Sequence, residues 1–180
     1  LRMYELFVGP PELDAEWDDR GIEGVSRFLN RFYNLVMDSK DKDIEATKEM
    51  IKLRNKLVYD IETRFDQFGL NTVIAGFMEY NNKLAEAAKK TGGVDKETME
   101  TFIRLLAPFA PHITEELWEQ YGHTDSVFHT EWPKADEEAM KDDEIEIAVQ
   151  INGKTKVVIM VPAEISKEDA IEAGKAALGN

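Results

Sequence analysis

The sequence contains no cysteine among its 180 residues. A chain without cysteine forms no disulfide bonds, has no thiol nucleophile and builds no cysteine-based zinc or iron–sulfur site. Histidine is also scarce, with His112, His123 and His129 the only three. His112 and Glu116 are four residues apart, but no further histidine or carboxylate stands at a convincing ligand spacing, so solvated or hydrogen-bonded histidines are the simpler interpretation. We predict no metal site.

Long apolar runs are absent as well. No stretch approaches the roughly 20 apolar residues that span a bilayer, and the N-terminus lacks the basic flank and apolar run of a signal peptide. These absences predict a soluble, cytoplasmic protein without a membrane partner. Residue 1 is leucine rather than an initiator methionine, so we expect a piece of a longer protein.

Motifs that carry catalysis are missing too. There is no P-loop, no G-x-G-x-x-G and no G-x-S-x-G elbow in the sequence. Acidic runs at 136–138 and 142–144 contain paired carboxylates, but a catalytic pair needs burial to separate its two pKa values. We predict no catalytic residue and no cofactor in this chain.

The charge is strongly negative, at −14, with 36 acidic against 22 basic residues. The hydrophobic fraction of 43% excludes an intrinsically disordered chain. Much of the acidity lies between residues 115 and 146, where 12 acidic residues face 2 basic ones. Because charges are screened beyond roughly 8 Å at physiological salt, other segments can still present basic faces to an anionic partner.

Most of the chain shows apolar residues three or four positions apart, which indicates helices. The spacing predicts the end of a helix before Gly9-Pro10-Pro11, and then helices over 22–38, 44–68, 71–90, 95–107 and 111–121. Asp43, Asn71 and Asp95 are the expected N-caps. Gly69 and Gly92 are expected to end helices, and Gly76 to mark a close helix–helix contact.

The period changes near the C-terminus, where apolar and polar residues alternate over 145–151 and 155–161. Asn152-Gly153 between them is a strong hairpin-turn signal. Ser166 with Asp169 predicts the start of a last helix. A two-stranded sheet is marginal alone, so we expect this domain to be truncated, with its boundary near 136–143.

Basic and amide side chains fall largely outside the apolar stripes of two predicted helices. An arginine side chain can hold a phosphate through two parallel hydrogen bonds, and amides can contact phosphate, ribose or base edges. The alternative is pairing within each helix, such as Glu23 with Arg27 or Glu49 with Lys52. The spacing alone leaves both interpretations open for Arg20, Arg27, Asn30, Arg31 and Asn34 in the first helix and Lys48, Lys52, Arg54 and Lys56 in the second.

Four segments resemble a known family. Residues 105–118 read LLAPFAPHITEELW, which closely resembles the L-L-A-P-F-A-P-H-[IL]-x-E-E-L-W signature of class Ia aminoacyl-tRNA synthetases. Residues 10–31 look like the segment after the catalytic domain of bacterial leucyl-tRNA synthetases. Residues 149–154, VQINGK, and 70–74, LNTVI, are similar to that family's V-Q-[IV]-N-G-K and F-N-T-A-I. The order and spacing of all four hold over nearly the whole chain.

The resemblance implies a mainly α fold: a class Ia anticodon-binding helical bundle, followed by a partial, truncated α+β domain of a β-hairpin and one helix. Residues 1–11 would end the preceding catalytic or stem-contact region, 12–138 would form the bundle, and 144–180 the truncated domain. The family's H-I-G-H and K-M-S-K-S signatures do not occur. The parent would join leucine to tRNA using ATP, whereas this fragment would catalyse nothing.

The resemblance also implies a partner and a contact surface. The bundle would contact the backbone of tRNA(Leu), weakly in isolation, and orient its acceptor end, while the acidic runs point away from RNA. The expected contacts are Arg20, Arg27, Asn30, Arg31 and Asn34, then Arg54 and Lys56, with Lys154 and Lys156 on one face of the hairpin meeting the tRNA elbow. We take Trp17, Trp118 and Trp132 as packing anchors.

Two other interpretations stay open. The first is a helical adaptor that binds another protein and has no RNA role, with its acidic segment steering a basic partner. The second is a dimer formed by edge-to-edge pairing of the hairpin, although a monomer is the simpler expectation.

Overall fold

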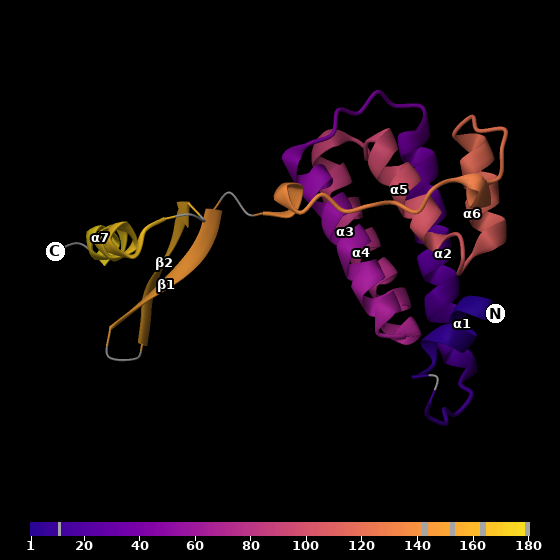
Figure 1. Ribbon diagram of the computed structural model, residues 1–180, viewed down its shortest axis with the longest axis horizontal. Coiled ribbons are helices and arrows are strands. Elements are labelled where there is room, and N and C mark those ends of the chain that lie inside the picture. Colours follow the sequence, from indigo (N-terminus) through magenta and orange to yellow (C-terminus); the bar gives the residue numbers. More distant parts are fainter. Residues whose placement is uncertain (11, 142–143, 152–153, 163–164, 179–180) are drawn as a thin grey trace. The chain divides into compact units, whose positions relative to one another are not determined.

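The computed structural model describes all residues except 11, 142–143, 152–153, 163–164 and 179–180. The chain divides into two compact units, Leu1–Met140 and Lys141–Asn180. The first unit is helical and the second holds a hairpin and one helix (Figure 1). The predicted mainly α fold with a small β-hairpin is therefore confirmed. No helix in the described part of the chain is both long and apolar enough to cross a membrane.

The first unit begins with a short helix, α1 (Arg2–Phe7), packed against the start of α2 (Asp19–Lys40). The Tyr4 hydroxyl donates to the Asp18 carbonyl at 2.7 Å and accepts from the Asp18 amide at 2.9 Å. Gly21 makes this contact possible, because a Cβ there would collide with the Tyr4 ring. Trp17 packs edge-on against Tyr4, as expected of a packing anchor, although it remains 57% exposed.

Helix α2 begins three residues earlier than predicted because Asp18 caps it, accepting from the Arg20 amide at 3.0 Å. Its buried stripe is Val25, Phe28, Phe32 and Val36. That stripe confirms the predicted helical face and leaves the opposite face to solvent.

Helices α3 (Lys48–Asp66) and α4 (Leu70–Thr91) pack side by side. The predicted start of α3 at Asp43 is wrong, because Thr47 is the N-cap and accepts from the Met50 amide at 3.2 Å. The predicted end at Gly69 is also wrong: Phe68 takes the positive φ, at 56°. Gly69, rather than Asn71, precedes α4 as its N-cap residue.

Helices α3 and α4 approach each other closely at Gly76. A Cβ there would stand 2.5 Å from Arg64 Nη1 and 3.3 Å from Ile61 Cδ1, which confirms the predicted close approach. The buried stripe of α3 ends before Phe65 and Phe68, which are in phase with it but are 49% and 63% exposed.

Helices α5 (Lys96–Leu106) and α6 (Pro111–Gln120) follow the predicted signals. Asp95 caps α5 by accepting from the Thr98 amide at 3.0 Å, and Pro111 occupies the first turn of α6. Phe102 on α5 lies 4.6 Å from Phe32 and 5.6 Å from Phe77, measured between ring centroids. These rings join α2, α4 and α5 in one core.

An extended segment leads from α6 across α3 and α5 to the end of the first unit. It contains two short 3₁₀ turns, Val127–His129 and Glu138–Met140. Of the apolar side chains at 127, 128 and 132, Val127 is buried, whereas Phe128 and Trp132 are 52% and 39% exposed. The Asp136 amide donates to Asn55 Oδ1 at 2.8 Å, which fastens the segment to α3.

The second unit consists of β1 (Glu144–Ile151), β2 (Lys154–Pro162) and α7 (Lys167–Leu178). The strands are antiparallel, with a register irregularity beside Val149 and Gln150. Val161 is buried. Ser166 caps α7 through the Asp169 amide at 3.1 Å, as predicted. The Asn152-Gly153 turn, like Pro11 of the N-terminal stop signal, lies outside the described residues.

Candidate nucleic-acid interface

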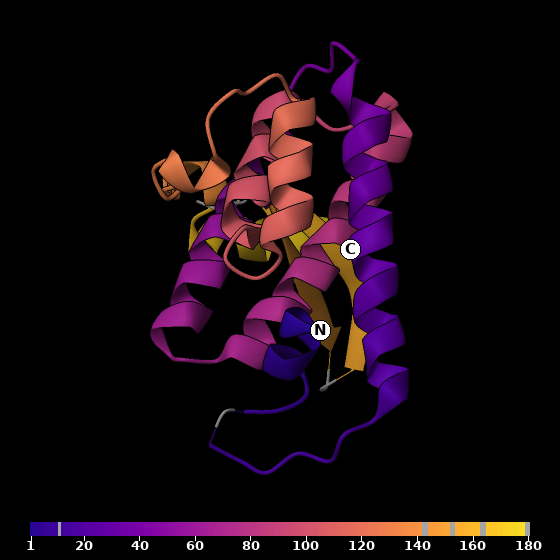
Figure 2. The ribbon, with the colours of Figure 1, turned by 90° about the vertical axis from the view of Figure 1, so that its right-hand side faces the viewer.

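The basic and amide residues of α2 form one exposed row. Positions 20, 27 and 34 are seven apart, and 30 and 31 fall between them, so they share a helix face. The apolar stripe on the other side turns this face outward, and all five side chains are exposed. Helix α2 runs along one edge of the helical unit (Figure 2). We call this surface the α2 row: Arg20, Arg27, Asn30, Arg31 and Asn34.

The α2 row carries a local positive charge in an acidic protein. Residues 20–34 include three arginines and one acidic residue, Glu23. The predicted alternative, a Glu23–Arg27 pair, is not formed: Arg27 has no ion pair with any described residue. Asn30 and Asn34 likewise make no side-chain hydrogen bond within the described chain. Their donors and acceptors are available to a ligand.

Arg20 differs from the rest of the row because it is engaged by Asp18. Its Nε and Nη2 lie 3.0 and 2.9 Å from the two Asp18 carboxylate oxygens. These hydrogen bonds lower the pKa of the Asp18 carboxyl and raise that of the Arg20 guanidinium. The Arg20 side chain is 89% exposed, so a phosphate can still reach it but must compete with Asp18.

Arg31 is held by a neighbouring helix. Its Nη2 donates to Oδ1 of Asn82 on α4 at 2.6 Å. This single neutral contact orients the guanidinium without cancelling its charge. The sequence pattern did not reveal Asn82, because 51 residues separate it from Arg31 and nothing in the local spacing links them.

Arg54 and Lys56 on α3 do not extend the α2 row. The Arg54 side chain is only 15% exposed and its Nη1 lies 2.6 Å from Glu97 Oε2 on α5. Arg54 also points to a different side of α3 from Lys48, Lys52 and Lys56, because two residues correspond to about 200° of helical rotation. Lys56 is half-buried and already has a partner.

The hairpin candidates lie in the second unit. The Lys154 side chain is outside the described residues. Lys156 is exposed, and it falls in the irregular register between the Gln150–Thr155 and Val149–Val157 pairs. The prediction that Lys154 and Lys156 share one face assumed that side chains alternate strictly along β2. That alternation is interrupted at this irregularity.

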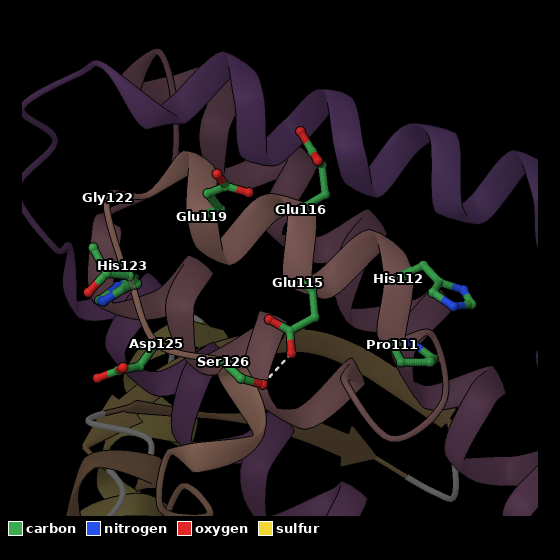
Figure 3. Close-up of a pocket in the computed structure, with 10 residues that line it drawn as sticks. Pro111, His112, Glu115, Glu116, Glu119, Gly122, His123, Asp125 and Ser126 are labelled. Carbon is green, nitrogen blue, oxygen red and sulfur yellow. Dashed lines mark hydrogen bonds between the residues drawn. The ribbon is translucent and has the colours of Figure 1, made fainter.

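The acidic residues of α6 surround a separate hollow (Figure 3). Glu115 accepts from the Ser126 hydroxyl and from the Val127 amide, the latter at 3.2 Å. Glu116, Glu119 and Asp125 also line this hollow, which we call the α6 pocket. Its carboxylates repel phosphate, and among the described residues no three metal-ligating side chains gather closely enough to hold a metal ion.

His112 and His123 also border the α6 pocket. His123 stacks on Trp118, with ring centroids 3.7 Å apart, and its Nε2 lies 2.7 Å from Glu100 Oε1. Trp118 is buried at 6% exposure, as predicted for a packing anchor. These contacts give the histidine a role in packing.

Comparison with known proteins decides the family. A sequence profile described as the anticodon-binding domain of tRNA ligase matches residues 47–171. The chain belongs to this family. The matched anticodon-binding region starts at Thr47, so the α2 row lies before it.

Curated relatives extend the match to the N-terminal helices. The leucine–tRNA ligase of Chlorobaculum parvum is 42% identical over 180 residues, covering 97% of this chain and 22% of that protein. The one from Fervidobacterium nodosum is 42% identical over 185 residues, covering 94% of this chain and 23% of that protein. The chain spans about a fifth of the length of the curated relatives it matches.

A solved structure agrees with these relatives. The Agrobacterium radiobacter K84 LeuRS, crystallised in a ternary complex with tRNA and LeuAMS, is 28% identical, with a TM-score of 0.73. The match covers 97% of this chain and 24% of that one. Together, the matches confirm that this anticodon-binding domain resembles part of a leucyl-tRNA synthetase.

Proposed function

We propose that this chain is the tRNA-contacting part of a leucyl-tRNA synthetase and that it positions tRNA(Leu). The parent enzyme would attach leucine using ATP in its catalytic domain, and this chain would contribute no reacting group. The observation that carries the proposal is the α2 row, an exposed set of cationic and amide side chains on a member of the anticodon-binding family. We keep 12–138 as the bundle and 144–180 as the C-terminal domain within this proposal.

The chemistry of the α2 row suits an RNA backbone. Arg27 and Arg31 offer planar donor forks that match phosphate oxygens, and Asn30 and Asn34 offer donors and acceptors to ribose hydroxyls. Contacts of this kind fix the register and orientation of a nucleic acid but read little sequence. The row therefore positions tRNA rather than recognising its bases.

The acidic α6 pocket disfavours RNA, in contrast to the α2 row. Its glutamates repel the phosphates that the arginines attract, and this repulsion orients an approaching RNA toward α2. Arg54 ranks below the α2 row because Glu97 already neutralises it. Lys56, Lys154 and Lys156 remain secondary candidates for tRNA contact.

The proposal is tested by titrating the chain with tRNA(Leu) and with an unrelated tRNA at several salt concentrations. With two to four phosphate contacts, we expect a Kd on the order of 10–100 µM at physiological salt. The variant Arg27→Ala/Arg31→Ala should bind more weakly and lower the slope of log Kd against log salt by about 1 per arginine removed.

The matched control is Lys89→Ala/Lys96→Ala, which removes two positive charges whose side chains are 69% and 66% exposed outside α2. It should leave both the affinity and the salt slope nearly unchanged. Equal losses in the two double variants would show that only net charge matters. An unchanged salt slope in the α2 variant would contradict the proposal.

A further inference from the structure

A second polar groove lies on the side of the helical unit opposite α2. The extended segment crosses α3 and α5 in Figure 1, and Figure 2 shows it across the unit from α2. Beneath it is a cavity of about 470 Å³ lined by residues of α3, α5 and this segment. The residues that matter here are Arg54, Asn55, Arg104, Trp132 and Lys134, and we call this cavity the α3–α5 groove.

The walls of the α3–α5 groove are fixed by hydrogen bonds of Asn55 and by an ion pair of Arg54. Asn55 is buried, donates to the Ile51 carbonyl at 2.8 Å and accepts from the Asp136 amide at 2.8 Å. Arg54 bridges to Glu97 on α5. These contacts fix the positions of α3, α5 and the extended segment, so the groove is present without a ligand.

Among the described residues, the guanidinium of Arg104 lacks both a counter-ion and a hydrogen-bond partner for its Nε. Its Nε is buried and has no hydrogen-bond partner within the described chain. Its Nη2 makes only a long contact of 3.4 Å with the Thr101 hydroxyl. No described carboxylate forms an ion pair with Arg104. A partly buried guanidinium without a counter-ion is costly, and an anion entering the groove would relieve that cost.

The neighbours of Arg104 narrow the identity of the anion. Three basic residues line the groove, Arg54, Arg104 and Lys134, but so do Glu97, Glu131 and Asp136. Because three acidic side chains offset the three basic ones, the groove favours a singly charged anion over a doubly charged phosphate monoester. Trp132, 39% exposed, adds an aromatic surface on which a base can stack. A carboxylate ligand would gain nothing from that ring.

We propose that the α3–α5 groove binds one phosphodiester of a single-stranded RNA segment. The Arg104 guanidinium holds the phosphate, Lys134 adds a second cation at the rim, and the adjacent base stacks on Trp132. The choice of RNA rests on the proposed function, whereas the preference for a phosphodiester rests on the groove itself.

The test is a nuclear magnetic resonance titration of the whole chain with the dinucleotide ApA. The Arg104 Nε–H and Trp132 indole N–H signals should shift together and saturate. Inorganic phosphate, which lacks the base, should move Arg104 less and leave Trp132 unmoved. Arg104→Gln should weaken ApA binding at least about tenfold, since it removes a charge-assisted bidentate contact. Arg104→Lys, which keeps the charge but loses the fork, should also weaken it and preserves more of the packing.

Lys96→Gln is the matched control, because it removes one charge from the same helix at a side chain 66% exposed. It should bind ApA like the parent chain. Absence of shifts at about 10 mM ApA, ten times a Kd of about 1 mM, would overturn the proposal. So would inorganic phosphate saturating Arg104 at the same concentration as ApA. Arg27→Ala/Arg31→Ala should retain ApA binding, which separates failure of this groove from failure of the α2 row.

Discussion

Replacing Asn55 with alanine should detach the extended segment from α3. The side chain is 6% exposed and makes two hydrogen bonds, one within α3 and one to the amide of Asp136, 81 residues away. Asn55→Ala removes both and leaves a small void. Removing a buried amide costs about 1–3 kcal/mol, because its hydrogen-bond partners are left unsatisfied. We therefore expect the free energy of unfolding to fall by about that amount.

Amide hydrogen exchange at Asp136 measures the loss of this hydrogen bond directly. In the parent chain the Asp136 N–H is bonded to Asn55, and in Asn55→Ala it faces solvent. The expected loss corresponds to exchange about 5–150 times faster at Asp136, because about 1.4 kcal/mol is a factor of ten. Amides of α2 that exchange through local opening should keep their rates, since that helix does not contact the segment through Asn55. Amides of α2 that exchange only through global unfolding should accelerate in step with the lost free energy of unfolding.

Asn30→Ala is the control for the same change of residue type at an exposed position. It should alter neither the stability nor the exchange at Asp136. If Asn55→Ala also left the Asp136 exchange rate unchanged, the hydrogen bond would not hold the segment, and the fixed walls of the α3–α5 groove would lose their basis.

Three further outcomes follow from particular contacts. Gly21→Ala should lower the free energy of unfolding by about 1–3 kcal/mol, measured by urea denaturation, because the new methyl group meets the Tyr4 ring. Asp95→Ala should cost about 0.5–2 kcal/mol in the same assay, because it removes the N-cap of α5. Burial and the hydrogen bond to Asp60 raise the pKa of Tyr80, so the folded chain keeps that proton above about pH 10, where an unfolded tyrosine loses it. Stability should therefore fall as the pH rises beyond that value, and less steeply in Tyr80→Phe, as followed by alkaline unfolding.

Local signals in the sequence identified most helices and several of their caps. As predicted, Asp95 caps the start of α5, and Gly92 ends α4 in the left-handed conformation. The start of α3 was misplaced because Asp43 also has a capping side chain and Ile44 continues the apolar period. Periodicity cannot choose between two caps four residues apart, and here Thr47 is used.

Periodicity also fixes the phase of a helix without showing how far its neighbours extend. Phe65 and Phe68 are in phase with the stripe of α3 but stand largely exposed at its end. Contacts between distant segments were beyond the sequence pattern altogether. Asn82 beside Arg31, and Asn55 beneath Asp136, join residues 51 and 81 positions apart.

For the candidate interface, the sequence predicted the α2 row as a shared face because a single helix determines it. Arg54 needed the packed bundle, since only the approach of α5 places Glu97 against its guanidinium. Which arginines are paired and which are available is therefore a property of tertiary structure rather than of spacing.

The central claim is that tRNA contacts the α2 row. The most direct measurement is a titration of the nitrogen-15-labelled chain with tRNA(Leu), following the Nε–H signals of its arginines and the backbone amides. We expect the largest changes at Arg27 and Arg31, with the amides around the α6 pocket unaffected. Changes confined to the α6 pocket, or none in a folded chain at low salt, would contradict the claim.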